Sequence, residues 1–402
     1  MKKVLLIIYK IEDHKGSEDA SGYDIAKGLI QKGINLEIIT RSNNASLLKN
    51  DIAFKNINIH SVDVPKLLAF YKKKGRGIIL YYYLWQFFVS KYIKNTLDIE
   101  NYSIIHQVNF HTDWAPHFFY KLPVKKVWGP VMHHEKVPFD CILNYRFKNY
   151  IGELIKETAK QYFWRIDPFL KKSISKTDRI IYANKNYAKP FRNIKNITHI
   201  PLGGVDSNFD GSKQNDTTFR VLSVGRLVNL KGFYLTVKSF LIFSSAIKSN
   251  QNATLTIIGK GPLFGPLKNL CSKSEYSKNI HFIEWLPRHE LIHHYQNADI
   301  LLYPSFESQG LVVSEAMACG VPTITIDNTG PHFLSGDTGW VIKRGSFHSM
   351  TQELSDCLKE SFEEKGTTKE IERMDLAKQR FRSYLCSDAV VNNIIKVYKD
   401  LF

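Results

Sequence analysis

The stretch from Tyr303 to Thr325, YPSFESQGLVVSEAMACGVPTIT, most constrains the fold of this chain. The apolar run 300–303 predicts a buried parallel strand, and residues 314–319 predict a short helix that ends at Gly320. A second apolar run follows, so the order is strand, loop, helix and strand. This order places the loop at the carboxyl end of a parallel sheet, where open α/β sheets bind ligands. We therefore expect an α/β fold with a ligand site in this loop.

Two glutamates in this stretch, Glu307 and Glu315, flank Gly310. A carboxylate accepts two hydrogen bonds at once, which suits the paired hydroxyls of a ribose or a hexose. We expect Glu315 near the start of the helix, where the positive end of the helix dipole favours an ionised carboxylate. Gly310 has no side chain and would let a ligand approach the backbone between the carboxylates. The alternative is that both glutamates are solvated surface charges.

The two glutamates, with seven residues between them and the pattern A-x-A-x-G-x-P after them, resemble the signature of the retaining glycosyltransferases of family GT4. This resemblance implies the GT-B fold, α/β with two Rossmann-like doubly wound domains facing across a cleft. It also implies that Glu307 contacts the transferred sugar and that Glu315 binds the ribose of the nucleotide. The donor-binding residues implied in the same stretch are Gly310, Leu311 and Val312.

A second loop, GRLVNLKG from Gly225 to Gly232, carries two cations. Arginine binds a diphosphate by bidentate hydrogen bonds, and lysine binds it as a point charge. In an arbitrary sequence solvated cations would be the favoured interpretation, but the form G-R-L-x-x-x-K-G resembles the same family. The resemblance implies that Arg226 and Lys231 hold the donor diphosphate beside Gly225 and neutralise the charge that grows on the leaving group. No cofactor and no catalytic metal are then expected.

Three further loops complete the donor site that the resemblance implies. The strand 4–9 is followed by a loop containing Gly16, whose backbone would approach the donor diphosphate. The strand 254–258 ends at Gly259, beside the nucleotide base. Backbone atoms near Leu286 would also meet the base.

A histidine just past a strand of the first domain is common in the family, where it contacts the sugar near the reacting carbon. His111 is the nearest match in this sequence and His106 the alternative, since Val108 occupies the usual place. A structural histidine buried against Trp114 is a further possibility. His133, His134 and Glu135 resemble metal ligands only superficially, because adjacent histidines point in divergent directions.

Composition changes along the chain divide it into domains. The polar run 207–218 predicts a linker. We expect an acceptor-side Rossmann-like domain at 1–200 and a nucleotide-sugar-binding domain at 201–387. In GT-B proteins the final helix typically returns to the first domain, so the amphipathic helix at about 388–402 is expected to pack there.

The net charge of +17 points to an anionic partner. No nucleic-acid motif accompanies the charge, so nucleic acid is not an expected partner. The basic cluster 72–76 precedes the apolar and aromatic run 78–89, a combination that suits contact with an anionic membrane surface. The alternative is that this run is a core helix and that the basic cluster before it is a solvated segment. No stretch is long and apolar enough to span a bilayer, and the five scattered cysteines fit a cytosolic protein.

The sequence thus predicts an enzyme that moves a hexose from a nucleotide diphosphate sugar to an acceptor hydroxyl, with retention of configuration. The run Trp128-Gly129-Pro130-Val131 is similar to a subgroup of GT4 enzymes in bacterial polysaccharide assembly. We therefore expect a glycan acceptor, with a lipid-linked glycan as the preferred candidate, and a cytoplasmic location, with the inner face of the cytoplasmic membrane as a candidate site. The alternatives are a GT-B nucleotide-sugar epimerase and a catalytically silent glycan- or membrane-binding relative.

Overall fold

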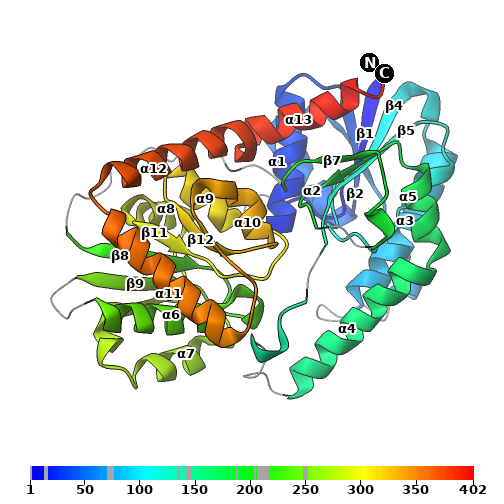
Figure 1. Ribbon diagram of the computed structural model, residues 1–402. Helices are drawn as coiled ribbons and strands as arrows, with labels where there is room; N and C mark the ends of the chain where they lie inside the picture. The colour runs from blue at the N-terminus through cyan, green and yellow to red at the C-terminus, as the bar shows by residue number, and fades with distance from the viewer. Residues whose placement is uncertain are drawn as a thin grey trace. The chain divides into compact units, whose positions relative to one another are not determined.

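The computed structural model describes residues 2–12, 17–69, 77–133, 136–141, 147–186, 189–202, 205, 217–247 and 252–402. The chain forms two compact units, each with a parallel sheet and interleaved helices (Figure 1). Unit 1 comprises Met1–His133, Ile151–Gly204 and Ser387–Phe402, and unit 2 comprises His134–Tyr150 and Val205–Cys386. The predicted α/β class is confirmed.

In the described part of unit 1, seven parallel strands form a sheet of order β3-β2-β1-β4-β5-β6-β7. The strands are β1 Lys3–Ile7, β2 Leu36–Thr40, β3 Asn58–Ser61, β4 Tyr102–Gln107, β5 Lys125–Val131, β6 Arg179–Tyr182 and β7 Ile197–His199. The α-helices are α1 Ser17–Gln31, α2 Ser42–Lys49, α3 Ile78–Thr96, α4 Phe147–Ile166, of which residues 147–150 belong to unit 2, α5 Pro168–Lys176 and α13 Ser387–Lys399.

Strand β1 explains why the amino-terminal sequence is apolar without alternation. Val4 and Leu6 pack into one core with α1 and α13, whereas Leu5 and Ile7 pack into another with α3. Successive side chains of a strand point to opposite faces of the sheet, so a strand covered on both faces must be apolar throughout. The interpretation of this segment as a core strand is confirmed.

The carboxyl-terminal helix α13 lies beside α1 in unit 1 (Figure 1). The two helices approach closely at Gly28, where a Cβ atom would lie 2.4 Å from Cγ2 of Val391. Farther along α13, the Tyr398 hydroxyl lies 2.6 Å from Nδ1 of His106, and Nε2 of His106 lies 2.7 Å from the Gly129 carbonyl oxygen. Because a carbonyl only accepts, Nε2 carries the proton and Nδ1 accepts from Tyr398. Burial lowers the pKa of His106 to about 4, so the ring is neutral.

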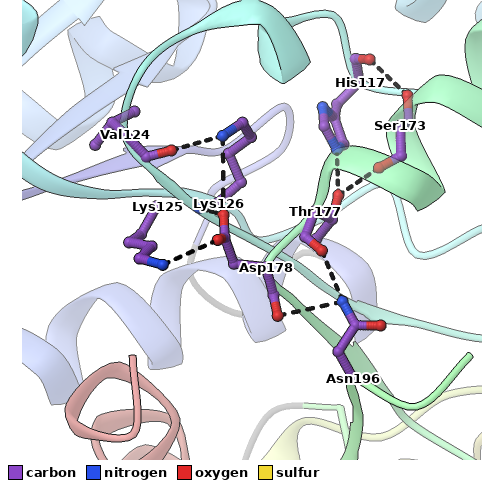
Figure 2. Close-up of polar contacts among 8 residues, drawn as sticks. All are labelled: His117, Val124, Lys125, Lys126, Ser173, Thr177, Asp178 and Asn196. Carbon is purple, nitrogen blue, oxygen red and sulfur yellow. Dashed lines mark hydrogen bonds and ion pairs between the residues drawn. The ribbon is translucent and has the colours of Figure 1, made fainter. Parts of the chain in front are cut away.

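A polar network joins α5 to the amino ends of β5 and β6 (Figure 2). The Lys126 backbone N–H donates to Oδ2 of Asp178 at 2.8 Å, which joins the two strands. The Thr177 hydroxyl donates to the Ser173 carbonyl of α5 at 2.6 Å and lies 2.8 Å from Nε2 of His117. The Ser173 hydroxyl donates in turn to the His117 carbonyl at 2.7 Å. Burial lowers the pKa of His117 to about 3, so this histidine is also neutral.

Helix α3 contains the apolar run 78–89. One face is buried in the core of unit 1, with Tyr82, Trp85 and Val89 at its centre. The opposite face leaves Leu80 and Phe87 about half exposed. The basic cluster 72–76 lies outside the described residues, so its membrane contact stays a prediction. In the part of the chain that the structure describes, we find no helix with the length and apolarity that a bilayer span requires.

In the described part of unit 2, six parallel strands form a sheet of order β10-β9-β8-β11-β12-β13. The strands are β8 Phe219–Val224, β9 Ala253–Ile258, β10 Ile280–Ile283, β11 Ile300–Leu302, β12 Thr323–Ile326 and β13 Trp340–Ile342. The α-helices are α6 Phe233–Ala246, α7 Phe264–Cys271, α8 Arg288–Asn297, α9 Leu311–Ala318, α10 Gly330–Ser335, α11 Phe347–Glu364 and α12 Thr368–Arg380. The two faces of this sheet have separate cores, one with α6 and α11 and the other with α8 and α9.

The segment 134–150 belongs to unit 2, although the chain on both sides of it belongs to unit 1. Its described residues show how it is held. The Phe347 backbone N–H donates to Oδ2 of Asp140 at 2.5 Å, and Arg344 donates to the Lys136 carbonyl. Val137 and Cys141 pack against the core of unit 2.

Candidate functional site

Four neighbouring strands of unit 2 bring most of the predicted donor residues to one edge of the sheet. These strands are β10, β9, β8 and β11, and their pairings are parallel, so their carboxyl ends lie at the same edge. The loops that follow them carry Leu286, Gly259, the segment 225–231 and the segment 307–310. This edge is where open parallel sheets bind ligands.

Lys231 and Glu307 form an ion pair at this edge. Nζ of Lys231 lies 2.5 Å from Oε1 and 2.5 Å from Oε2 of Glu307, and 2.5 Å from the Tyr303 hydroxyl. The Tyr303 hydroxyl itself donates to Oε1 of Glu307. The side chains of Lys231 and Glu307 are 14% and 17% exposed, so the pair is largely withdrawn from water but still accessible. Sequence reasoning missed Tyr303, although it opens the stretch that contains Glu307.

The loop after β8 turns sharply to bring Lys231 to this position. The single 3-10 turn Asn229–Lys231 ends at Gly232, whose φ of +71° is left-handed. A Cβ atom at Gly232 would lie 2.0 Å from the Pro304 carbonyl oxygen. Only glycine therefore permits the close approach of this loop to the segment after β11. That approach carries Lys231 toward Tyr303 and Glu307.

Gly225 and Gly259 pack the loops after β8 and β9 backbone against backbone. A Cβ atom at Gly259, where φ is +154°, would lie 1.9 Å from the Gly225 carbonyl oxygen. The Gly225 N–H donates to the Ile258 carbonyl at 2.9 Å. Arg226, the next residue, is exposed and forms no ion pair with any described residue. An exposed guanidinium beside a closely packed glycine turn is well placed to bind an anion.

Gly310 differs from its expected role. A Cβ atom there would lie 2.9 Å from Cε1 of Tyr303 and 3.2 Å from Oε1 of Glu307. Its φ of −172° is ordinary extended backbone, so conformational freedom is not what requires glycine. The small residue makes room for the Tyr303–Glu307 contact. The expected close approach of a ligand to this backbone stays a prediction.

The position of Glu315 on its helix also differs from the expectation. Helix α9 begins at Leu311, three residues before the predicted start, because Gly310 serves as its N-cap. Glu315 is then the fifth helical residue, beyond the first turn where the dipole acts most strongly. Its Oε2 instead accepts a 2.8 Å hydrogen bond from the hydroxyl of Tyr295 on α8. Burial, and then the nearby Glu315, raise the pKa of Tyr295, so this hydroxyl stays a donor.

The remaining donor-site candidates in unit 2 lie on the same helix or the same edge. Leu311 and Val312 form the first turn of α9. Both are half-buried against the core that lies between the sheet of unit 2 and helices α8 and α9. Leu286 follows β10 and is half-buried against the same core. Next to it, the Trp285 side chain is 67% exposed.

The candidates of the first domain lie in unit 1. Nδ1 of His111 lies 2.6 Å from the Pro130 carbonyl oxygen, and the ring is buried. The alternative, His106, has both ring nitrogens hydrogen-bonded within unit 1, as described above, which leaves neither for a sugar hydroxyl. Gly16 lies outside the described residues.

The histidines near residue 133 do not form a metal site in the described structure. Nδ1 of His133 lies 3.1 Å from Oδ2 of Asp113, a fully buried carboxylate that also accepts from Tyr182 and Trp164. His134 and Glu135 lie outside the described residues. Within the described ranges, no group of three or more histidine, cysteine, aspartate or glutamate side chains is placed to hold a metal ion.

A comparison of the sequence with known protein families gives a match that includes the donor-site edge of unit 2. Residues 205–375 match the family model described as Glycosyl transferases group 1. The matched residues lie in unit 2 and include every predicted donor residue of that unit. The resemblance to glycosyltransferases that the sequence motifs indicated is confirmed.

Curated relatives match part of the chain. It is 24% identical over 197 residues to the GDP-mannose-dependent alpha-(1-6)-phosphatidylinositol monomannoside mannosyltransferase of Mycolicibacterium smegmatis, a match that covers 44% of this chain and 51% of the relative. It is 26% identical over 149 residues to the putative colanic acid biosynthesis glycosyltransferase WcaL of Escherichia coli, covering 35% and 36%. The chain thus spans about half the length of the first relative and about a third of the second.

Solved structures match the whole chain. WaaG, a glycosyltransferase involved in lipopolysaccharide biosynthesis, aligns with a TM-score of 0.60 at 15% identity, covering 98% of this chain and 99% of WaaG. Anabaena HepE in complex with UDP aligns with a TM-score of 0.64 at 15% identity, covering 100% of both chains. The chain therefore has the two-domain α/β fold of the GT-B glycosyltransferases, as predicted.

Proposed function

We propose that this protein is a retaining glycosyltransferase that moves a hexose from a nucleotide diphosphate sugar to an acceptor hydroxyl. The observation that carries the proposal is the edge of unit 2, where Arg226, Lys231 and Glu307 lie on the loops after two neighbouring strands. Two cations next to a carboxylate suit a ligand with a diphosphate at one end and sugar hydroxyls at the other. The group 1 glycosyltransferase match over the same residues supports this interpretation.

In this proposal Arg226 and Lys231 act on the leaving diphosphate. Cleavage of the sugar–phosphate bond increases negative charge on the phosphate oxygens, and fixed cations stabilise that charge in the transition state. Glu307 and Tyr303 hold the Lys231 ammonium at this edge, and a diphosphate oxygen would share or replace one of its three contacts. Retention follows if the acceptor attacks from the face that the diphosphate leaves, with a phosphate oxygen taking the hydroxyl proton. No metal ion is required for these roles.

The two glutamates orient the other parts of the donor. A carboxylate that accepts from vicinal hydroxyls fixes the rotation of a sugar ring. We assign Glu307 to the hexose and Glu315 to the ribose, with Gly259 and Leu286 beside the base. His111 is assigned to the sugar from unit 1. Tyr295 fixes the Glu315 carboxylate by its 2.8 Å hydrogen bond and is a positioning residue.

The acceptor is proposed to be a glycan of bacterial surface polysaccharide assembly, carried on a lipid at the cytoplasmic face of the membrane. The net charge of +17 favours an anionic partner or surface. The relative from Mycolicibacterium smegmatis is named as a phosphatidylinositol monomannoside mannosyltransferase and WcaL as a putative colanic acid biosynthesis glycosyltransferase, and both names support a glycan acceptor.

The test is a transfer assay with a panel of nucleotide sugars and lipid-linked glycan acceptors. The proposal predicts that nucleoside diphosphate is released only when acceptor is present, and that NMR of the product shows the donor's anomeric configuration. With an epimerase, the release of nucleoside diphosphate would not depend on the acceptor. A silent binding protein would show no turnover with any pair. An inverted product would contradict the assignment of retention.

A further inference from the structure

A pocket of about 750 Å³ lies in unit 1. It is bounded by the end of α4, by one face of α5 and by the segment 189–194. A volume of this size is within the range of small-molecule sites. None of the site residues predicted from the sequence lines this pocket.

Four cations line the pocket, one from α4, one from α5 and two from the segment 189–194. They are Arg165, Lys171, Lys189 and Arg192. Among the described residues, none of the four forms an ion pair, and the described lining includes no carboxylate. Like charges gathered around a hollow raise the local positive potential, because no carboxylate of the lining offsets them. This arrangement favours a ligand with more than one negative charge.

We call the two buried lining residues, Trp164 and Ile174, the floor of the pocket. Both are apolar and pack in a core of unit 1. Nε1 of Trp164 donates to Oδ1 of Asp113 at 3.2 Å, and the same carboxylate holds His133, another lining residue. The aromatic and aliphatic floor can therefore bind an apolar or sugar group while the cations bind an anion. Guanidinium groups at the rim match phosphate oxygens by bidentate hydrogen bonds.

We propose that this pocket binds the phosphate or diphosphate group of the acceptor. The identity of the ligand as the acceptor rests on the proposed function. The inference that the ligand carries a phosphate rests on the four cations alone. In a lipid-linked glycan the diphosphate joins the lipid to the sugar, so the cations would hold the junction and the apolar floor would contact the adjoining chain. This site would select acceptors that carry a phosphate over neutral glycans.

The test measures binding of two probes, inorganic pyrophosphate and farnesyl diphosphate, by titration calorimetry. Arg226 and Lys231 are proposed to bind a diphosphate too, so the parent protein for this experiment carries Arg226→Ala and Lys231→Ala. The pocket variant adds Lys171→Ala and Arg192→Ala. The matched control adds Lys172→Ala and Lys195→Ala, which remove the same charge from exposed positions beside the pocket but outside its lining.

Each charged contact typically changes affinity by about ten- to a hundredfold, so the pocket variant should bind farnesyl diphosphate at least roughly tenfold more weakly than the control. Tighter binding of farnesyl diphosphate than of pyrophosphate would identify the lipid-attached group as the ligand, and equal binding would identify the free phosphate. Unchanged binding in the pocket variant, with an unchanged thermal unfolding temperature, would overturn the proposal. A separate titration measures nucleotide-sugar binding to the protein with intact Arg226 and Lys231. If no nucleotide sugar binds, the proposed function is overturned and not the pocket proposal.

Discussion

The ammonium of Lys231 contacts both carboxylate oxygens of Glu307 at 2.5 Å. The sequence motifs assign these residues to opposite ends of a donor, the cation to the diphosphate and the carboxylate to the sugar. In the proposed donor site, one ion pair would therefore orient both groups. Charge on the leaving diphosphate would therefore be electrostatically coupled to Glu307 through Lys231.

The first prediction concerns this ion pair. Lys231→Ala should lower the rate of sugar transfer by about a hundred- to a thousandfold, as expected when a fixed transition-state donor is lost. Glu307→Gln should lower it as well. The double variant should lose less than the sum of the two in free energy, because groups in direct contact are coupled by about 0.5–3 kcal/mol. Lys238→Ala, an exposed lysine on α6, is the matched control and should keep the parent rate. Additive losses would contradict the coupling.

The second prediction concerns the contact between Gly225 and Gly259. Gly259→Ala places a methyl group 1.9 Å from the Gly225 carbonyl oxygen at a φ of +154°. Backbone strain and overpacking together should lower the free energy of unfolding by about 2–6 kcal/mol. Gly366→Ala is the control, because its φ of +77° is also left-handed but nothing lies within 4 Å of its Cβ position. It should lower the free energy of unfolding by the cost of the left-handed backbone alone, about 1–2 kcal/mol. Guanidinium unfolding curves measure both, and equal stability of the two variants would refute the packing argument.

The third prediction is a loss of stability in mild acid. The pKa values of His106 and His117 are about 4 and about 3, below the ordinary value of about 6.5 that applies in the unfolded chain. Between these limits the unfolded state binds more protons, so stability is complete above pH 6.5 and falls as the pH decreases. The slope should approach about 1.4 kcal/mol per pH unit for each histidine.

Chemical unfolding at pH 7 and pH 5 measures this slope. His117→Gln should remove the contribution of this histidine, since glutamine cannot titrate but can still donate a hydrogen bond toward Thr177. The rest of the slope comes from His106 and from His199 and His294, whose pKa values burial also lowers. Glu37, whose pKa its hydrogen-bond partners lower to about 2, loses its contribution only below about pH 4.5 and does not affect this window. A stability that is constant from pH 7 to pH 5 would be the contrary result.

The fourth prediction concerns the return of the carboxyl-terminal helix to unit 1. Tyr398→Phe removes the hydroxyl that donates to the buried Nδ1 of His106 and should cost about 1–3 kcal/mol in the free energy of unfolding. Tyr162→Phe, at a position that is 54% exposed, should change it by less than about 0.5 kcal/mol. Comparable unfolding midpoints for the two variants would show that this hydrogen bond does not anchor α13.

Much of the fold follows from local sequence patterns. The continuous apolar run of β1 and the strand after Asn297 are typical of strands buried on both faces, and glycine ends such as Gly33 and Gly320 are left-handed, as helix ends require. These signals depend only on neighbouring residues. The sequence pattern predicts the start of α9 three residues late, because a glycine such as Gly310 is typical of a loop as well as of a helix cap.

The side-chain partners at the candidate site could not be predicted in this way. Tyr303 lies four residues from Glu307 in the sequence. Its contact with Lys231, however, depends on the turn of the loop after β8 at Gly232. Tyr295 lies twenty residues from Glu315 and meets it only when α8 and α9 pack. His106 shows the same limit, because its partner Tyr398 is 292 residues away. The segment 134–150 joins unit 2 through Asp140 and Lys136, contacts that no local pattern encodes.

The central claim, that the edge of unit 2 binds a nucleotide diphosphate sugar, is tested most directly by donor titration. UDP-glucose, UDP-galactose and GDP-mannose would be titrated into the intact protein and into its Arg226→Ala variant by calorimetry. We predict that at least one donor binds and that the variant binds it roughly ten- to a hundredfold more weakly, since a charged hydrogen bond is worth about 1.5–3 kcal/mol. Binding of none of these donors, or equal affinity in the variant, would contradict the account.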